Sequence, residues 1–225
     1  MDISLHYVKK GSGAPLLLLH GNGESGDYFV HQMDEFARYF TVYAVDTRGH
    51  GQSPRGTAPF TISQFADDLL GFMDEQGIER AHILGFSDGG NIVLTFALRH
   101  PGRVGRLVLN GANLDPAGVR PSVQLPIVLG YKLASLFQAP KARANAELLG
   151  LMVNEPHIHP EELAALTMPV LVVAGSRDMI KASHSRLIAD SLPDGRLVTI
   201  EGDHFIANKQ PGPFNRAVLE FLRQR

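Results

Sequence analysis

The sequence predicts an α/β fold with a doubly wound, mostly parallel sheet of about seven to eight strands. Two observations lead to this prediction. Short apolar runs of strand length alternate along the chain with longer segments of helical period. Most of the short runs lack polar–apolar alternation, which is typical of strands that are buried on both faces of a parallel sheet. Strands that alternate with helices in this way indicate one sheet with helices on both faces.

The predicted strands are short runs rich in valine, isoleucine and leucine. A first strand is expected at Ile3–Val8, and six further runs follow at Leu16–Leu19, Val42–Val45, His82–Gly85, Arg106–Leu109, Val170–Ala174 and Leu197–Ile200. Helices are predicted between them at Ile62–Gln76, Asn91–His100, His184–Leu192 and Phe214–Leu222. Thr61 or Ser63 is placed to cap the first of these helices.

One region interrupts the alternation. Residues Asp115–Met168 contain no convincing strand, but they hold helical stretches at Val123–Phe137, Ala142–Val153 and Pro160–Leu166. We therefore predict an α/β core made of residues 1–114 and 169–225, with residues 115–168 inserted as a small helical cap. An ordinary helical layer is the alternative, since nothing marks the insertion as a separately folding domain.

Composition narrows the class of protein. The chain has 225 residues, 44% of them hydrophobic, and a formal net charge of −2, so one globular domain is expected and nucleic acid is not an expected partner. The absence of cysteine excludes disulfides and thiol catalysis and suits a cytoplasmic location. The N-terminal residues have no apolar core typical of a signal peptide. Leu16–Leu19 is too short to span a bilayer, and we expect no membrane partner.

A glycine-rich turn around Ser87 is the strongest chemical signal. Gly85, Ser87 and Gly89 form a Gly-x-Ser-x-Gly pattern between a buried predicted strand and an apolar predicted helix. In that context the pattern indicates a sharp strand–turn–helix connection with the serine at its tip. The helix N-terminus then points at the same place and favours negative charge there. The alternative is a glycine-rich turn with a solvated serine.

A serine nucleophile needs a base, and His204 is the best placed of the ten histidines. It follows the last predicted strand, so it should lie at the carboxyl edge of the sheet, where the turn around Ser87 also opens. His157 and His159 lie in a proline-flanked loop, where a zinc site is conceivable. No third ligand is suggested nearby, so we expect a surface loop and no metal.

The acid that orients the base should lie at the same edge. Asp178 follows the predicted strand Val170–Ala174 and could accept a hydrogen bond from His204. It could instead cap the next helix. Asp203 is a weaker candidate for the acid, because the side chains of sequence neighbours such as Asp203 and His204 diverge.

The chain order of serine, aspartate and histidine resembles that of the α/β-hydrolase superfamily, in particular its small esterase, lactonase and cofactor-free perhydrolase-like members. His20-Gly21-Asn22-Gly23 is similar to the oxyanion loop of that family. Asp46 to Ser53 is similar to its turn after the next strand, and His100-Pro101 also matches. The resemblance extends from Ile3 to Phe221. The family often has one strand more before the first strand predicted here.

The resemblance implies roles for particular residues. Ser87 would attack a carbonyl carbon, His204 would transfer the proton, and Asp178 would hold His204. The backbone N–H groups of Asn22 and Asp88 would form the oxyanion hole. No cofactor is implied, and the expected partner is a small-molecule substrate of a monomer or homodimer. Residues expected to line its pocket are Asn22, Tyr28, Phe86, Leu136, Phe137, Met152, Met179 and Phe205.

These features predict hydrolysis of a small carboxylic ester, lactone or related acyl substrate. Related enzymes that use an aspartate nucleophile are disfavoured, because Ser87 occupies that position. A carbon–carbon bond hydrolase or a perhydrolase could use the same three side chains. A ligand-binding receptor that keeps the fold is the alternative from a different class, and slow turnover with tight binding would favour it.

Overall fold

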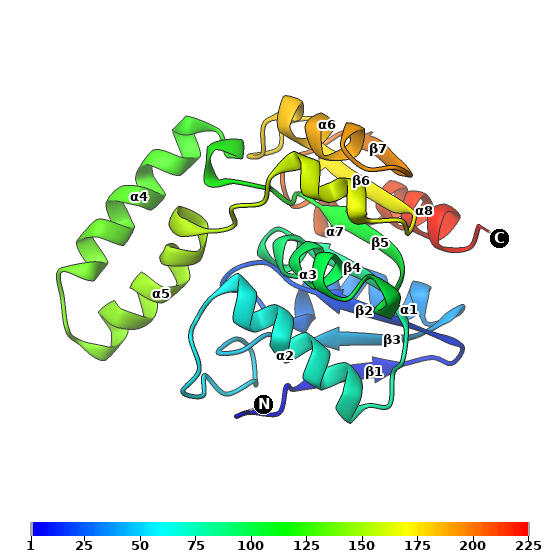
Figure 1. The fold of residues 1–225 in the computed structure, drawn as a ribbon, viewed down its shortest axis with the longest axis horizontal. Coiled ribbons are helices and arrows are strands. Elements are labelled where there is room, and N and C mark those ends of the chain that lie inside the picture. The colour runs from blue at the N-terminus through cyan, green and yellow to red at the C-terminus, as the bar shows by residue number, and fades with distance from the viewer. Residues whose placement is uncertain (1, 225) are drawn as a thin grey trace.

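Seven strands form one sheet in the computed structural model, which describes residues 2–224 (Figure 1). The strand order is β1-β3-β2-β4-β5-β6-β7, and only β1 runs antiparallel to its neighbour. The strands are β1 (Tyr7–Lys10), β2 (Ala14–Leu19), β3 (Phe40–Val45), β4 (Ala81–Phe86), β5 (Val104–Asn110), β6 (Val170–Gly175) and β7 (Gly195–Ile200). This architecture confirms the predicted mostly parallel α/β sheet.

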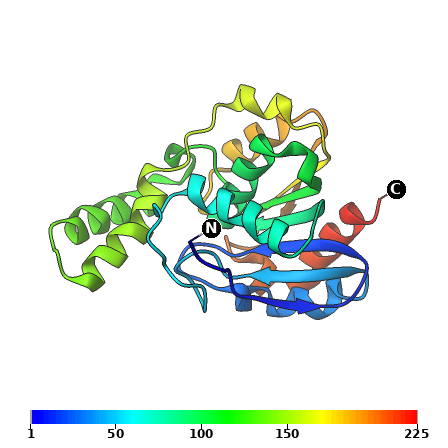
Figure 2. The same ribbon diagram turned by 60° about the horizontal axis from the view of Figure 1, so that its bottom comes forward.

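Helices cover both faces of the sheet (Figure 2). One face carries α2 (Ile62–Glu75), α3 (Asp88–Arg99) and α6 (Ala182–Asp190), and the other carries α1 (Val30–Phe36), α7 (Ile206–Lys209) and α8 (Pro211–Leu222). Strand β2 shows why two layers are needed. Leu17 and Leu19 pack into one apolar cluster, whereas Leu16 and Leu18 pack into the other. Successive side chains of a strand point to opposite faces, so an unbroken apolar run needs cover on both.

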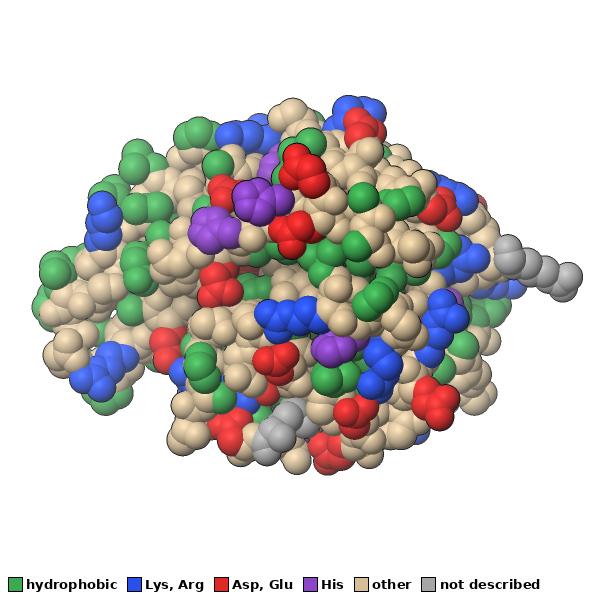
Figure 3. Space-filling view, viewed as in Figure 1, with side chains coloured by type: hydrophobic (Ala, Val, Ile, Leu, Met, Phe, Trp, Pro, Cys, Tyr) green, Lys and Arg blue, Asp and Glu red, His purple; other side chains and the backbone are tan. Residues whose placement is uncertain are grey.

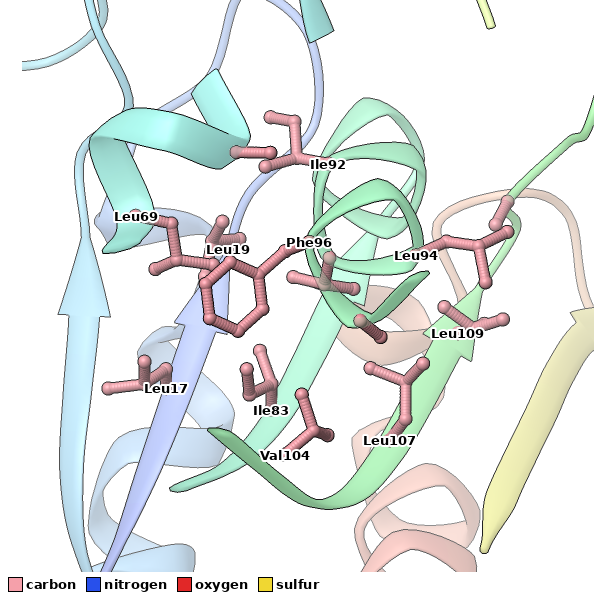
Figure 4. Packing of buried hydrophobic residues seen from close by; sticks show 14 of the residues in the cluster. Leu17, Leu19, Leu69, Ile83, Ile92, Leu94, Phe96, Val104, Leu107 and Leu109 are labelled. Atoms are coloured by element: carbon pink, nitrogen blue, oxygen red, sulfur yellow. The ribbon is translucent and has the colours of Figure 1, made fainter. Parts of the chain in front are cut away.

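Helix α3 packs over the middle of the sheet. Its side chain Phe96 points towards β2 and β4, where it lies beside Leu19 and Ile83, and Ile92 is buried in the same apolar cluster (Figure 4). Each fully buried side chain of this size stabilises the fold by roughly 1.5–3 kcal/mol. This packing fixes the N-terminus of α3 at the carboxyl end of β4, which is where Ser87 lies.

A helical hairpin is inserted between β5 and β6. Helices α4 (Pro121–Ser135) and α5 (Pro140–Asn154) lie side by side and project from the body of the molecule (Figure 1, Figure 2). Short 3-10 segments precede and follow the hairpin at Pro116–Gly118 and Pro160–Ala165. Leu151 and Leu163 are buried in the apolar cluster that lies under α3, so the base of the hairpin is anchored to the core.

The structure differs from the sequence prediction at the N-terminal end. The first strand is Tyr7–Lys10 instead of Ile3–Val8, because its pairing with β3 begins at Tyr7 opposite Val45. Helix α1 was not predicted, since only two of its seven residues, Gln32 and Phe36, are buried and the apolar signal is weak. Helix α2 begins where expected, with Thr61 as its cap: the Thr61 hydroxyl accepts a hydrogen bond from the backbone N–H of Gln64 (3.1 Å).

Candidate active site

Ser87 stands at a sharp turn between β4 and α3. Its φ of 53° makes it the one residue besides glycine with a positive φ among residues 2–224. The two flanking glycines are required by space. A Cβ on Gly85 would lie 2.3 Å from the carbonyl oxygen of Gly89, and a Cβ on Gly89 would lie 2.3 Å from that of Leu19. The strained backbone is held in place by a hydrogen bond from the Ser87 N–H to the carbonyl of Asn110 (2.8 Å).

Ser87, His204 and Asp178 form a chain of hydrogen bonds. The Ser87 Oγ lies 2.9 Å from His204 Nε2, and His204 Nδ1 lies 2.6 Å from Asp178 Oδ1. An ionised carboxylate can only accept hydrogen bonds, so His204 Nδ1 carries a hydrogen and donates a hydrogen bond to Asp178. In the neutral ring Nε2 is then the acceptor, and the Ser87 hydroxyl donates to it. This is the geometry that a general base needs to remove the serine proton.

The carboxylate of Asp178 is buried but well provided with donors. Burial alone would raise its pKa. The hydrogen bond from His204 and those from the backbone N–H groups of Ile180 (3.0 Å) and Gly175 (3.2 Å) outweigh burial and lower the pKa below its ordinary value. Asp178 therefore stays ionised beside the imidazole. Asp203, the weaker candidate, bonds instead to Lys209 and to the Phe205 N–H.

The His204 ring is enclosed by neighbouring groups. Phe86 lies against it with ring centroids 4.9 Å apart, and Phe205 approaches edge-on at 5.6 Å. Gly111, which follows β5, has a φ of +64° and leaves no room for a side chain: a Cβ there would lie 2.6 Å from His204 Cε1. His204 is thus held by packing as well as by hydrogen bonds.

The residues predicted to supply the oxyanion hole are in direct contact. Asp88 is the first residue of α3, and the N–H groups of the first helical turn have no acceptor within the helix. Asn22 follows β2, whose end adjoins that of β4 because Leu19 pairs with Gly85. The Asn22 side-chain amide donates to Asp88 Oδ2 (2.8 Å). Both backbone segments therefore converge beside Ser87.

The same amide ties the α4–α5 hairpin to the sheet domain. Asn22 Nδ2 also donates to the carbonyl oxygen of Leu148 in α5 (2.7 Å). The pKa of Asp88 is raised to about 6: burial is the main cause and the nearby carboxyl of Glu155 adds to it, while the Asn22 hydrogen bond and His204 oppose the rise. Asp88 thus carries an energetically costly charge at neutral pH, at the point where α3, the loop after β2 and α5 meet.

Residues of the loop motifs have structural partners. His20 is buried and its pKa is lowered to about 4, chiefly by burial. It therefore donates from Nδ1 to the Gly21 carbonyl (2.7 Å) and accepts from the Thr47 N–H at Nε2 (3.0 Å). The fully buried Arg48 forms two hydrogen bonds of 2.7 Å with Asp68. These contacts fix the loops and leave the reacting groups to other residues.

The residues predicted to line the pocket divide into two groups. Phe86 and Phe205 lie against the His204 ring, and Tyr28 stacks on Phe86 with ring centroids 4.3 Å apart. Phe137 lines a groove of about 530 Å³ between α4, α5 and the Phe60–Thr61 segment. Leu136 is 75% exposed, and Met152 and Met179 are half-buried. The role of these residues in substrate binding stays a prediction.

Two further observations concern other classes of site. His157 Nδ1 lies 2.8 Å from Asp115 Oδ2 in an exposed pair. Within residues 2–224, no group of three or more histidine or acidic side chains is arranged to hold a metal ion. No helix in that same part of the chain combines the length and apolar character needed to cross a bilayer.

Three functional neighbours were missed by sequence reasoning. Gly111 packs on His204, and Glu24 accepts from the Gly21 N–H (3.2 Å) with its pKa raised by burial. The Leu148 carbonyl contacts Asn22. Only Gly111 had a possible signal, since it follows the end of a predicted strand at the same sheet edge.

Fold and site together define a class of protein. A mostly parallel sheet carries a serine on a sharp turn after one strand, with an aspartate and a histidine after later strands. The sequence matches the alpha/beta hydrolase fold family over residues 14–137, and the chain belongs to that family.

Individual relatives agree with this assignment. The chain is 33% identical over 259 aligned positions to the "Putative carbamate hydrolase RutD" of Caulobacter sp. strain K31, covering 99% of this chain and 96% of that protein. A solved hydrolase from Pseudomonas aeruginosa PA01 is 27% identical, with a TM-score of 0.82 and 99% of both chains covered. The enol-lactonase of Burkholderia xenovorans LB400 is 23% identical, with a TM-score of 0.83 and coverage of 99% and 97%; it shows a shared fold. Named relatives of this kind support an enzyme that acts as a hydrolase.

Proposed function

We propose that this chain hydrolyses small carboxylic esters, lactones or related acyl substrates through an acyl-enzyme on Ser87. The observation that supports the proposal is the continuous hydrogen-bond chain from Ser87 Oγ through His204 to Asp178, with distances of 2.9 and 2.6 Å. The Ser87 hydroxyl lies at the N-terminus of α3, where partial positive charge stabilises a developing oxyanion.

Each residue has a defined part in the proposed reaction. The Ser87 oxygen bonds to the substrate carbonyl carbon while its proton passes to His204 Nε2. Negative charge on the carbonyl oxygen is stabilised by the backbone N–H groups of Asn22 and Asp88. His204 then protonates the departing alkoxide, which leaves an acyl group on Ser87. A water molecule gives a proton to His204 Nε2 and attacks the acyl carbon. His204 then returns that proton to the Ser87 oxygen as the acyl–serine bond breaks, which releases the acid and restores the free serine.

The surroundings of His204 favour a small and mostly uncharged acyl group. The rings of Phe86 and Phe205 lie against the imidazole and Tyr28 stacks on Phe86, while the buried carboxyl of Asp88 and the half-buried carboxyl of Glu24 would repel an anionic group. A substrate with a neutral acyl part is the best match to these groups.

A fluorophosphonate probe tests the nucleophile directly. We expect one adduct, mapped by mass spectrometry to Ser87, and its loss in Ser87→Ala. With p-nitrophenyl esters, Ser87→Ala should lower kcat by roughly 10³-fold or more. Ser191→Ala is a matched control outside the site and should react like the wild type. An adduct on another residue of the folded protein would overturn the proposal.

Carbamate hydrolysis is the second candidate. The relative named RutD is similar along nearly its whole length, and its name gives a carbamate as substrate. A carbamate carbonyl can be attacked by the same serine. Comparing kcat/KM for aryl acetates, lactones and aryl carbamates of matched size would rank these substrates, and a carbamate preference of tenfold or more would favour this second candidate.

A further inference from the structure

The side chain of Asp88 is a buried carboxylate that has no part in the proposed reaction. Only its backbone N–H takes part there, while the residue as a whole is 7% exposed. Asn22 Nδ2 donates to Asp88 Oδ2 (2.8 Å), and within residues 2–224 no other group donates to this carboxylate. Its second oxygen, Oδ1, has no donor, yet it is not one of the unpartnered side-chain atoms that the protein encloses completely. One oxygen of a buried carboxylate is therefore left within reach of a small molecule.

The other buried aspartates of the described chain are much better provided with donors. Asp46, Asp68 and Asp178 each accept three hydrogen bonds, which are spread over both oxygens. Asp88 accepts one, on one oxygen. Burying a carboxylate without enough donors costs free energy, because the donors must replace the water that the group has lost. Asp88 is thus the exception among these groups, and a donor on a bound molecule would make up its shortfall.

Asp88 lies where a molecule bound at Ser87 would extend. It follows Ser87 at the N-terminus of α3, and its partner Asn22 belongs to the loop that is proposed to supply an oxyanion donor. The Asn22 side chain also donates to the Leu148 carbonyl, so α5 lies over the same place. A substrate whose carbonyl carbon is at Ser87 therefore brings its next few atoms close to Asp88.

The charges around Asp88 favour a donor over an acceptor. Asp88 forms no ion pair among residues 2–224, so a donor has no cation to displace. The carboxyl of Glu155, at the end of α5, adds negative potential and raises the pKa of Asp88. More broadly, acidic and histidine side chains gather at the base of the α4–α5 hairpin (Figure 3).

We propose that the Asp88 side chain selects substrates, with Oδ1 accepting a hydrogen bond from a neutral hydroxyl or N–H group close to the scissile carbonyl. This inference rests on the proposed function, because it needs a substrate carbonyl at Ser87, and it adds one hydrogen-bond donor to the small, mostly uncharged substrate proposed above. A hydrogen bond to a carboxylate is charge-assisted and stronger than one between neutral groups. Substrates that carry the donor should therefore have a kcat/KM higher by roughly 10- to 100-fold.

Matched esters test this preference. In p-nitrophenyl glycolate a hydroxyl replaces a methyl group of p-nitrophenyl propionate on the acyl side, and 2-hydroxyethyl acetate differs from propyl acetate in the same way on the alcohol side. After division by the uncatalysed rates, kcat/KM should be at least tenfold higher for the hydroxyl ester in one of the two pairs, and that pair locates the donor. For an acyl-side preference, p-nitrophenyl methoxyacetate, which keeps the oxygen but lacks the donor, should react like the propionate. Ratios near one in both pairs would overturn the inference.

Asp88→Asn tests whether this side chain causes the preference. Asn22 would still donate to the oxygen of the new amide, so the amide NH2 would take the place of Oδ1 and present a donor instead of an acceptor. In a variant that circular dichroism shows to be folded, the ratio should fall to about one. Asp203→Asn is the matched control and should keep the wild-type ratio, because Asp203 bonds to Lys209 and to the Phe205 N–H. An unchanged ratio in Asp88→Asn would refute the selecting role.

Failure of this inference can be told apart from failure of the proposed function. A wild type that hydrolyses both members of each pair equally well, and that forms the fluorophosphonate adduct on Ser87, would overturn the inference alone. A folded wild type that hydrolyses none of the esters and forms no adduct on Ser87 would overturn the proposed function, and the inference with it.

Discussion

The imidazole of His204 lies directly against the Cα of Gly111. A Cβ at that position would come within 2.6 Å of His204 Cε1 and 2.9 Å of Nδ1, closer than real Cβ contacts occur. The two residues come from different strand ends, after β5 and after β7. Gly111 therefore sets the position of a ring to which it has no hydrogen bond.

Gly111→Ala should displace His204 and lower kcat/KM at least 10²-fold, since small displacements of a positioned base are costly. Gly77→Ala is a close control, because Gly77 has nearly the same φ (+65°) but no atom near a new Cβ. Both changes should cost roughly 1–2 kcal/mol of stability through the left-handed backbone. Steady-state kinetics on an aryl ester separates the two. Equal activity of both variants would contradict the positioning role of Gly111.

Asp178→Asn should lower kcat roughly 10²- to 10⁴-fold, because an amide cannot stabilise the imidazolium and can favour the wrong tautomer. Asp203→Asn, next to His204 in sequence, should stay near wild-type activity because Asp203 bonds to Lys209 and Phe205 instead. If Asp203→Asn were the more damaging change, the assignment of the orienting acid would be wrong.

Asp88 should make stability fall as pH rises through the acidic range. Its pKa in the folded chain is about 6, against an ordinary value of 3.8, so the folded state holds a proton that the unfolded state has lost between those values. Asp88→Asn removes the cost of ionisation and should raise the free energy of unfolding at pH 7 by about 1–3 kcal/mol. Thermal melts at pH 7 and below pH 4 check this. The gain should disappear at the lower pH, and a gain independent of pH would argue against buried charge as its cause.

Asn22→Leu should loosen the cap while leaving the backbone N–H at position 22 in place. The Asp88 carboxylate and Leu148 carbonyl each lose a donor, at a cost of roughly 1–3 kcal/mol. Amide hydrogen exchange should accelerate in α5 more than in α3. We expect kcat to fall much less than in Ser87→Ala. A loss of kcat as large as that of Ser87→Ala, with α5 protection unchanged, would contradict this account.

Local sequence patterns predicted the fold well where a run of residues shows by itself on which faces it is buried. The unbroken apolar run Leu16–Leu19 required cover on both faces, and the structure provides it. The first strand was misplaced because its position depends on pairing with β3, which is distant in sequence. Helix α1 was missed because it buries too few side chains to give a periodic signal.

The contacts of the candidate site could be predicted only where they follow from the order of the strands. Ser87, Asp178 and His204 follow predicted strands, and parallel strands end at one edge, so their approach followed from the fold. The contact between Asn22 and Leu148 joins residues in a loop and a helix whose orientation no local pattern specifies. Gly111 matters only through the ring that it faces, which becomes visible once the strands are placed side by side.

The hairpin of α4 and α5 leaves the sheet from β5 and returns to β6, and these strands are neighbours, with Leu107 opposite Val170. The two arms that lead into and out of the hairpin are held together, because the Ile158 N–H donates to the Leu114 carbonyl (2.9 Å). For such a closed loop, doubling its length adds only about 0.6 kcal/mol of closure entropy. Segments of very different length can therefore be exchanged between β5 and β6 without changes to the sheet. This fold is accordingly suited to engineering in which a helical segment from another protein is inserted at that position.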